Sequence, residues 1–214
     1  MAGVTSQRLR STMQSYILIR HAETHSNSRA RWHGESDEPI SPNGRIRAAS
    51  AAQHLCKLNP KPKMVICSTL LRAVETADIF ANHLGSARVF HDQSLGERDM
   101  GDWKGMAPTE VNQRWPGMLA DWEAGRVGGP PNGETDAEVA ERALQVLSKY
   151  AGYDPSPILV VTHGGVIRSL IKARRLPNVP VPHLGGYWAR VNSCGPWQID
   201  SKVVLGDPSV RPLT

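Results

Sequence analysis

The chain has 214 residues, 40% of them hydrophobic, which is enough for one α/β domain with a substantial core. No apolar stretch approaches the length of a membrane span, which argues against an integral membrane protein. The net charge is +5, but Lys and Arg are scattered and interrupted by acids, which argues against a nucleic-acid-binding surface.

Residues 1–15 contain no acidic residue and no convincing amphipathic pattern, so we expect a disordered N-terminal tail before a single domain over 16–214. The three cysteines, Cys56, Cys67 and Cys194, have no paired spacing. We therefore expect a reducing compartment and a cytoplasmic protein.

A buried strand is predicted at 16–19, and Arg20 and His21 follow it directly. The carboxyl ends of strands in an α/β sheet form the crevice where ligands bind. An Arg-His pair at this point is suited to an anionic ligand.

Two helices are predicted next. Ser41-Pro42 is a typical start, with Ser as N-cap and Pro in the first position, and that helix ends before Asn59-Pro60. A second short strand at 64–67 leads into a helix opened by residues 68–77, with Arg72 in its first turn. A cation there opposes the helix dipole, which is unfavourable unless an anion binds between them.

Residues 106–134 interrupt the alternation of strands and helices, and we expect them to form an inserted cap segment over the ligand crevice. Trp115 and Trp122 within it either shape a substrate pocket or pack the insertion against the body, and the sequence leaves both readings open. A capping box at Thr135–Glu138 then predicts a helix with one apolar face, which ends before Asp154-Pro155.

The run 158–161 is a further buried strand, and it continues into Thr162-His163-Gly164-Gly165 and a helix pattern. Glycines at this turn let the backbone approach a ligand, and the helix offers free N–H groups to a phosphate. His163 therefore points to the same crevice as His21.

Residues 187–191 and 197–200 are candidate closing strands, and a hairpin is one arrangement open to them. The succession of elements predicts a three-layer, doubly wound α/β fold with a mostly parallel sheet and helices on both faces.

Together these motifs resemble the histidine phosphatase superfamily in its phosphoglycerate-mutase-like branch. The resemblance covers roughly residues 16–170 in the family's order and spacing. It is carried by Arg20-His21-Ala22-Glu23-Thr24 with Asn27, by Gly34 to Gly44, by Ser68 to Ala77, by Leu95-Gly96-Glu97 with Gly101 to Gly105, by Gly133-Glu134-Thr135, and by Thr162 to Gly165.

The resemblance implies that His21 is the phosphorylated nucleophile, while residue types alone do not distinguish it from His163. It implies that Glu97 donates the proton to the leaving group, with Asp99 as a second candidate. Arg20, Arg72 and His163 would complete the catalytic set by stabilising the transferred phosphoryl group. Further substrate- or phosphate-binding residues would be Asn27, Gly164, Thr24, Gly34, Arg98 and Glu134.

The function implied is hydrolysis of a small phosphorylated metabolite through a phosphohistidine. The alternatives are a cofactor-dependent phosphoglycerate mutase and an inactive protein that binds a phosphorylated ligand. Met100 argues against the mutase, because the mutases that the chain resembles have an aromatic residue at this position. No cofactor, metal, nucleic-acid or membrane partner is expected, because zinc-site and nucleotide-cradle motifs are missing. The sequence makes no prediction of the oligomeric state.

Overall fold

The computed structural model describes residues 13–25, 32, 37–177, 179–192 and 196–205. Its centre is a six-stranded sheet with strand order β3-β2-β4-β1-β5-β6. The strands are β1 (Met13–Arg20), β2 (Met64–Cys67), β3 (Arg88–His91), β4 (Ile158–Thr162), β5 (Gly185–Asn192) and β6 (Trp197–Val204).

Five of these strands run in the same direction, and one, β5, runs opposite to them. β1, β4, β2 and β3 pair in parallel, whereas β5 runs antiparallel to both β1 and β6. The mostly parallel α/β sheet is therefore confirmed, and β5 and β6 are the two predicted closing strands. The residues between them, including Cys194, lie outside the described part of the chain.

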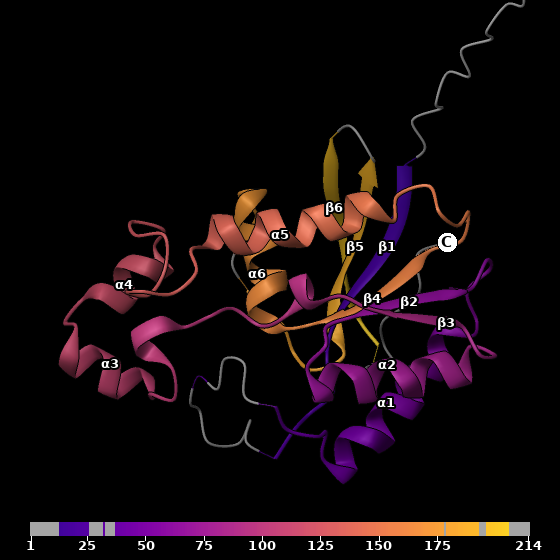
Figure 1. Ribbon diagram of the computed structural model, residues 1–214, viewed down its shortest axis with the longest axis horizontal. Helices are drawn as coiled ribbons and strands as arrows, with labels where there is room; N and C mark the ends of the chain where they lie inside the picture. The colour runs from indigo at the N-terminus through magenta and orange to yellow at the C-terminus, as the bar shows by residue number, and fades with distance from the viewer. Residues whose placement is uncertain (1–12, 26–31, 33–36, 178, 193–195, 206–214) are drawn as a thin grey trace, which may run out of the picture.

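Helices cover both faces of the sheet, as Figure 1 shows. α1 (Pro42–Leu55) and α2 (Leu71–His83) lie on one face, and α5 (Asp136–Lys149) and α6 (Gly164–Ala173) on the other. The strand period of two explains this arrangement. On β1, Ile17 and Ile19 join the core with α1 and α2, whereas Tyr16 and Leu18 join the core with α5 and α6.

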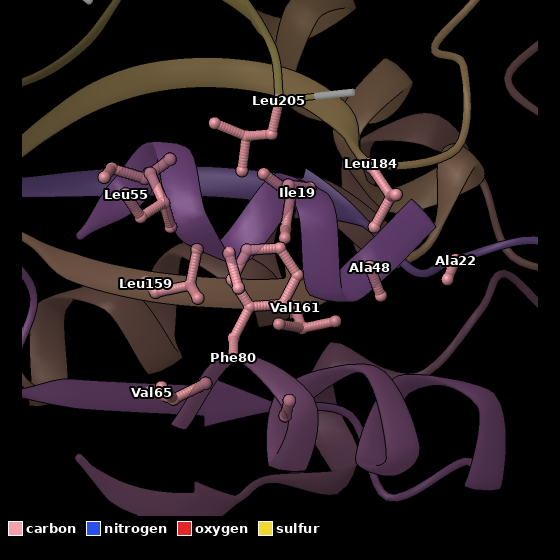
Figure 2. Packing of buried hydrophobic residues seen from close by; sticks show 14 of the residues in the cluster. Ile19, Ala22, Ala48, Leu55, Val65, Phe80, Leu159, Val161, Leu184 and Leu205 are labelled. Carbon is pink, nitrogen blue, oxygen red and sulfur yellow. The ribbon is translucent and has the colours of Figure 1, made fainter. Parts of the chain in front are cut away.

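The core on the α1 and α2 side is packed around Phe80, which is fully buried (Figure 2). Small residues of α1, among them Ala48 and Ala52, let this helix approach the sheet closely. Leu159 and Val161 contribute the surface of β4 that faces α1 and α2. This packing holds β1 and β4 in fixed register, with Arg20 opposite Thr162. The ends of the two strands are therefore level.

The helix starts follow the predicted caps. Ser41 accepts a hydrogen bond from the Gly44 N–H, and Thr135 and Glu138 form the reciprocal capping box of α5. Two differences from the sequence prediction are clear. β1 begins at Met13, so residues 13–15 belong to the strand and not to the tail. The short edge strand β3 was not predicted, because Arg88 and His91 interrupt its apolar pattern.

Two short helices, α3 (Pro108–Arg114) and α4 (Met118–Glu123), occupy the predicted cap segment, residues 106–134. In Figure 1 they lie at the left, beyond the end of the sheet and apart from the helix layers. They have a separate apolar cluster, in which Trp103 is fully buried and contacts the Trp115 and Trp122 rings. Packing against Trp103 therefore applies to both Trp115 and Trp122, and Trp122 also lines a pocket between the cap segment and α6.

Candidate active site

Three neighbouring parallel strands deliver the candidate site residues to one edge of the sheet. His21 follows β1, His163 follows β4 and Ser68 follows β2. The backbone ladder continues past the strand ends, because the His21 N–H donates to the Thr162 carbonyl at 2.9 Å and the Ser68 N–H to the Val161 carbonyl at 3.1 Å. The His21 and His163 rings are consequently close, with centroids 5.2 Å apart.

His21 is held as a neutral ring with one free nitrogen. Its Nδ1 lies 2.7 Å from the Ala22 carbonyl oxygen, which can only accept a hydrogen bond, so Nδ1 carries the proton and Nε2 the lone pair. Burial lowers the pKa of His21 well below its usual value, and the coulombic interactions with His163, Arg20 and Arg72 act in the same direction. A neutral imidazole with an exposed lone pair is a competent nucleophile.

The loop that carries His21 is fixed from the α2 side. The Ala22 N–H donates to Thr76 Oγ1 at 3.0 Å, and the Thr76 hydroxyl donates to the Arg72 carbonyl at 2.6 Å. On the other side, the His183 Nδ1–H donates to the His21 carbonyl at 3.1 Å. These contacts hold the His21 backbone without using its Nε2.

His163 is oriented by Ser68. Ser68 Oγ accepts the Leu70 N–H at 3.2 Å and lies 2.8 Å from His163 Nε2, where either the hydroxyl or the ring N–H can donate. We infer that Ser68 donates, which leaves the ring proton on Nδ1; this nitrogen is buried and has no hydrogen-bond partner in the described structure. Burial lowers the pKa of His163 to about 3, although Glu97 opposes this shift. In the free protein His163 is thus a neutral N–H donor.

Two guanidinium groups, the half-buried Arg20 and the buried Arg72, add the positive charge of the site. Arg20 donates through Nη1 to the Val181 carbonyl at 3.0 Å, while its buried Nε has no partner among residues with a described position. Arg72 projects from the first turn of α2 and is 4% exposed. Burial lowers the pKa of both groups, against the effect of Glu97, yet each remains charged at neutral pH because an arginine pKa starts so high.

Glu97 is attached to the start of α6. Its carboxylate accepts the Gly165 N–H at 3.1 Å and the Arg98 N–H at 2.8 Å. A Cβ at position 165 would lie 2.2 Å from Glu97 Oε1, so only glycine leaves room for this carboxylate. Burial raises the pKa of Glu97, but His163, the Arg98 N–H and Arg168 together bring it below its usual value.

Other predicted site residues have different positions. Gly164 packs against Arg20, with a Cβ position 3.5 Å from Arg20 Nε, and Thr24 is buried where it bridges to Ile40. Asn27 and Gly34 lie outside the described residues.

The side chains of Arg98 and Glu134 form hydrogen bonds mainly with other residues of the protein. The Arg98 guanidinium is 2% exposed and binds Asp136, Ser169 Oγ and the Glu134 carbonyl. The Glu134 carboxylate receives two hydrogen bonds from Arg142 and one from the Asp99 N–H. Glu134 is therefore directed to Arg142, and not to the two histidines.

Three residues near the site were not selected from the sequence. Arg142 of α5 donates to the carbonyl oxygens of Ser94 and Gly96 at 2.7 and 2.9 Å, and so holds the segment that precedes Glu97. Ser68 orients His163, and the His183 ring lies 5.4 Å from the His21 ring. Of the three, only Ser68 lies in a motif that was recognised in the sequence. From the sequence, Arg142 resembles an ordinary surface residue of a helix, and His183 lies in a proline-rich loop.

Two buried histidines, two arginines and a carboxylate at the carboxyl edge of an α/β sheet define a site of the class that binds and transfers phosphoryl groups. Residues 16–187 match the model of the histidine phosphatase superfamily, branch 1. The chain belongs to this superfamily, which confirms the resemblance seen in its motifs.

Similar proteins include both phosphatases and mutases. Glucosyl-3-phosphoglycerate phosphatase of Mycolicibacterium vanbaalenii is 34% identical over 182 residues, covering 79% of this chain and 78% of that protein. Phosphoglycerate mutase-like protein 4 of Arabidopsis thaliana is 34% identical over 162 residues, covering 74% and 70%. The solved structure of a mycobacterial glucosyl-3-phosphoglycerate phosphatase with VO3 superposes with a TM-score of 0.74 at 25% identity, covering 88% of this chain and 98% of that one.

Proposed function

We propose that the protein is a phosphatase that hydrolyses small phosphate monoesters through a phosphohistidine on His21. The observation that carries the proposal is the fixed tautomer of His21, whose Nδ1–H is bonded to the Ala22 carbonyl and whose Nε2 is left with its lone pair beside His163 and Arg20. The phosphatase names of the relatives support the same reaction.

The first step transfers the phosphoryl group to the protein. His21 Nε2 attacks phosphorus, the N–P bond forms, and the ester P–O bond breaks as the leaving alkoxide takes a proton from Glu97. The His163 Nδ1–H and the guanidinium groups of Arg20 and Arg72 stabilise charge on the phosphoryl oxygens. In the second step Glu97 accepts a proton from water, which attacks phosphorus, and the N–P bond breaks to give inorganic phosphate and free His21.

Glu97 must be protonated before it can act as an acid. In the free protein its pKa is low, because the positive surroundings outweigh burial. A bound phosphate monoester brings negative charge into those surroundings and favours the protonated carboxyl. We infer that Glu97 acquires its proton together with the substrate, so that the acid forms only in the complex.

His21→Ala tests the nucleophile. The variant should lose phosphate release and the acid-labile phosphoenzyme formed from p-nitrophenyl phosphate. His83→Ala is the matched control, because His83 is exposed on α2 and bonds only its own helix backbone through Nδ1. A phosphoenzyme that persists in His21→Ala would transfer the nucleophile role to His163.

A mutase is the second candidate, favoured by relatives such as the 2,3-bisphosphoglycerate-dependent phosphoglycerate mutase of Rhizobium etli, which is 28% identical over 165 residues. Assays of 3-phosphoglycerate with and without 2,3-bisphosphoglycerate separate the two reactions. A phosphatase releases phosphate in both conditions, whereas a mutase yields 2-phosphoglycerate only with the bisphosphate. A protein that only binds phosphorylated ligands would do neither.

We further infer a cytoplasmic location. Cys56 and Cys67 are free thiols, and Cys67 is buried in β2, which fits a reducing compartment.

None of the helices in the described ranges has the length and apolar character needed to cross a bilayer. Among the same residues no group of three His, Cys, Asp or Glu side chains is arranged to hold a metal ion.

A further inference from the structure

A pocket of about 460 Å³ lies between the cap segment, α6 and residues 179–180, and we call it the cap pocket. Trp32 and Trp122 provide aromatic walls, and Arg168 and Lys172 of α6 provide positive charge. None of these side chains is assigned a contact with the phosphoryl group in the proposed reaction.

The cap pocket is connected to the proposed active site by one face of α6. Residues four apart on a helix lie above one another, so Gly164, Arg168 and Lys172 form a row. Gly164 packs against Arg20, and the neighbouring Gly165 N–H holds Glu97. Arg168 is one turn further along the row, about 6 Å along the helix axis. It lies close enough to Arg20 and Glu97 to lower the pKa of both groups.

The charged side chains of the cap pocket are ion-paired except at two positions among the described residues. Asp136 accepts hydrogen bonds from Lys172 Nζ at 2.8 Å and from the Arg98 guanidinium, so one carboxylate is shared by two cations. Arg168, by contrast, has no ion pair or hydrogen bond within the described part of the chain, and the same holds for Glu123 at the outer end of α4. Arg168 therefore presents an uncompensated guanidinium on the side next to Glu97.

The aromatic walls are rigid. Trp32 stacks on Trp103, with centroids 5.6 Å apart and an angle of 22° between the ring planes. The Trp122 Nε1–H donates to Asp136 at 3.1 Å, and Lys172 Nζ lies 4.9 Å from the centre of its ring. A pocket with fixed walls and one free cation is suited to recognise a small group of defined charge.

We propose that the cap pocket binds the alcohol part of the substrate and that Arg168 recognises a carboxylate on it. This inference rests on the proposed phosphatase function. A planar guanidinium binds a carboxylate through two parallel hydrogen bonds, and one free cation matches a single negative charge better than a second phosphate. The substrate class is thus a phosphate ester of a hydroxy acid, and Arg168 is the residue that determines this specificity.

The test compares two esters of a primary alcohol, 3-phosphoglycerate and glycerol 3-phosphate, which differ in a carboxylate against a hydroxymethyl group. The wild-type protein should prefer 3-phosphoglycerate in kcat/KM. Arg168→Leu should lower kcat/KM for 3-phosphoglycerate by about 10- to 100-fold more than for glycerol 3-phosphate, as expected for loss of a charge-assisted hydrogen-bonded pair. Arg168→Lys should keep part of the preference.

Arg174→Leu is the matched control, because Arg174 follows the same helix, lies over the Trp197 ring and does not line the pocket. It should leave the ratio of the two esters as in the wild type. Circular dichroism and thermal unfolding of each variant report folding. The same two esters are also titrated by calorimetry into His21→Ala, which measures their binding without turnover.

The outcomes separate the two proposals. An equal loss of kcat/KM for both esters in Arg168→Leu, or equal binding of both esters to His21→Ala, would overturn the role of Arg168. Hydrolysis of glycerol 3-phosphate would in that case still support the phosphatase function. No hydrolysis of either ester or of p-nitrophenyl phosphate would refute the phosphatase function. In that case a carboxylate preference in calorimetry that Arg168→Leu removes would still support the cap pocket as a binding site.

Discussion

Gly165→Ala should selectively damage the proton donor. The new Cβ would lie 2.2 Å from Glu97 Oε1, whereas ordinary contacts begin at 3.4 Å, so the carboxylate must move by about 1.2 Å. The displaced carboxylate also loses its short approach to the Gly165 N–H. A misplacement of roughly 1 Å costs about 100-fold in rate, so we expect a loss of this size with an alkyl phosphate.

The expected loss depends on the leaving group. A general acid matters when an alkoxide must leave and matters little for a stable phenolate, whereas a phosphate-binding residue matters for both. Single-turnover formation of the phosphoenzyme is therefore measured with glycerol 3-phosphate and with p-nitrophenyl phosphate. Gly165→Ala and Glu97→Gln should both slow the first much more than the second. Arg72→Ala should slow both.

Two observations would refute this reasoning. A loss in Gly165→Ala that is equal for both esters would mean that Glu97 does not protonate the leaving group, and would direct attention to Asp99. A fall in thermal stability would indicate general distortion, because alanine in a helix is intrinsically favoured over glycine by about 1 kcal/mol. Gly164→Ala provides the comparison, since its Cβ would make only an ordinary 3.5 Å contact with Arg20 and a much smaller loss is expected.

Three further predictions concern charge and protonation. Treatment with EDTA should leave phosphatase activity intact, because protein donors already stabilise the phosphoryl charge; loss of activity restored by a divalent ion would contradict the mechanism. Ser68→Ala should lower kcat/KM by about 10-fold for both esters, because His163 loses the partner that keeps its proton on Nδ1; a loss confined to glycerol 3-phosphate would disprove that role. The free energy of unfolding should fall as the pH is lowered from 7 to 5, because burial lowers the pKa of His163 to about 3 and of His183 to about 4, so that the unfolded chain binds more protons below pH about 6.5. Denaturant titrations should show a slope reduced by up to about 1.4 kcal/mol per pH unit in His183→Gln, and an unchanged slope would exclude His183 as a source.

The carboxyl ends of β1 and β4 illustrate what the sequence by itself determined. Continuous apolar runs predict buried parallel strands, and each run ends directly at a functional pair, Arg20-His21 or Thr162-His163. Local chemistry also decides the helix starts at Ser41 and Thr135, because a cap acts on the next three residues of its own chain. Such features depend on neighbours in sequence, and they were predicted correctly.

Only the tertiary structure decided the protonation and the partners of the site. The free Nε2 of His21 follows from a bond to the Ala22 carbonyl, and the Nδ1 proton of His163 follows from Ser68, which is 95 residues away in the chain. Arg142 and Arg168 look alike as helix arginines, yet in the folded protein Arg142 donates hydrogen bonds to the segment before Glu97, whereas Arg168 faces the cap pocket. The difference arises from segments brought together by the sheet and by the cap segment, and no local sequence pattern encodes which charge will find a partner.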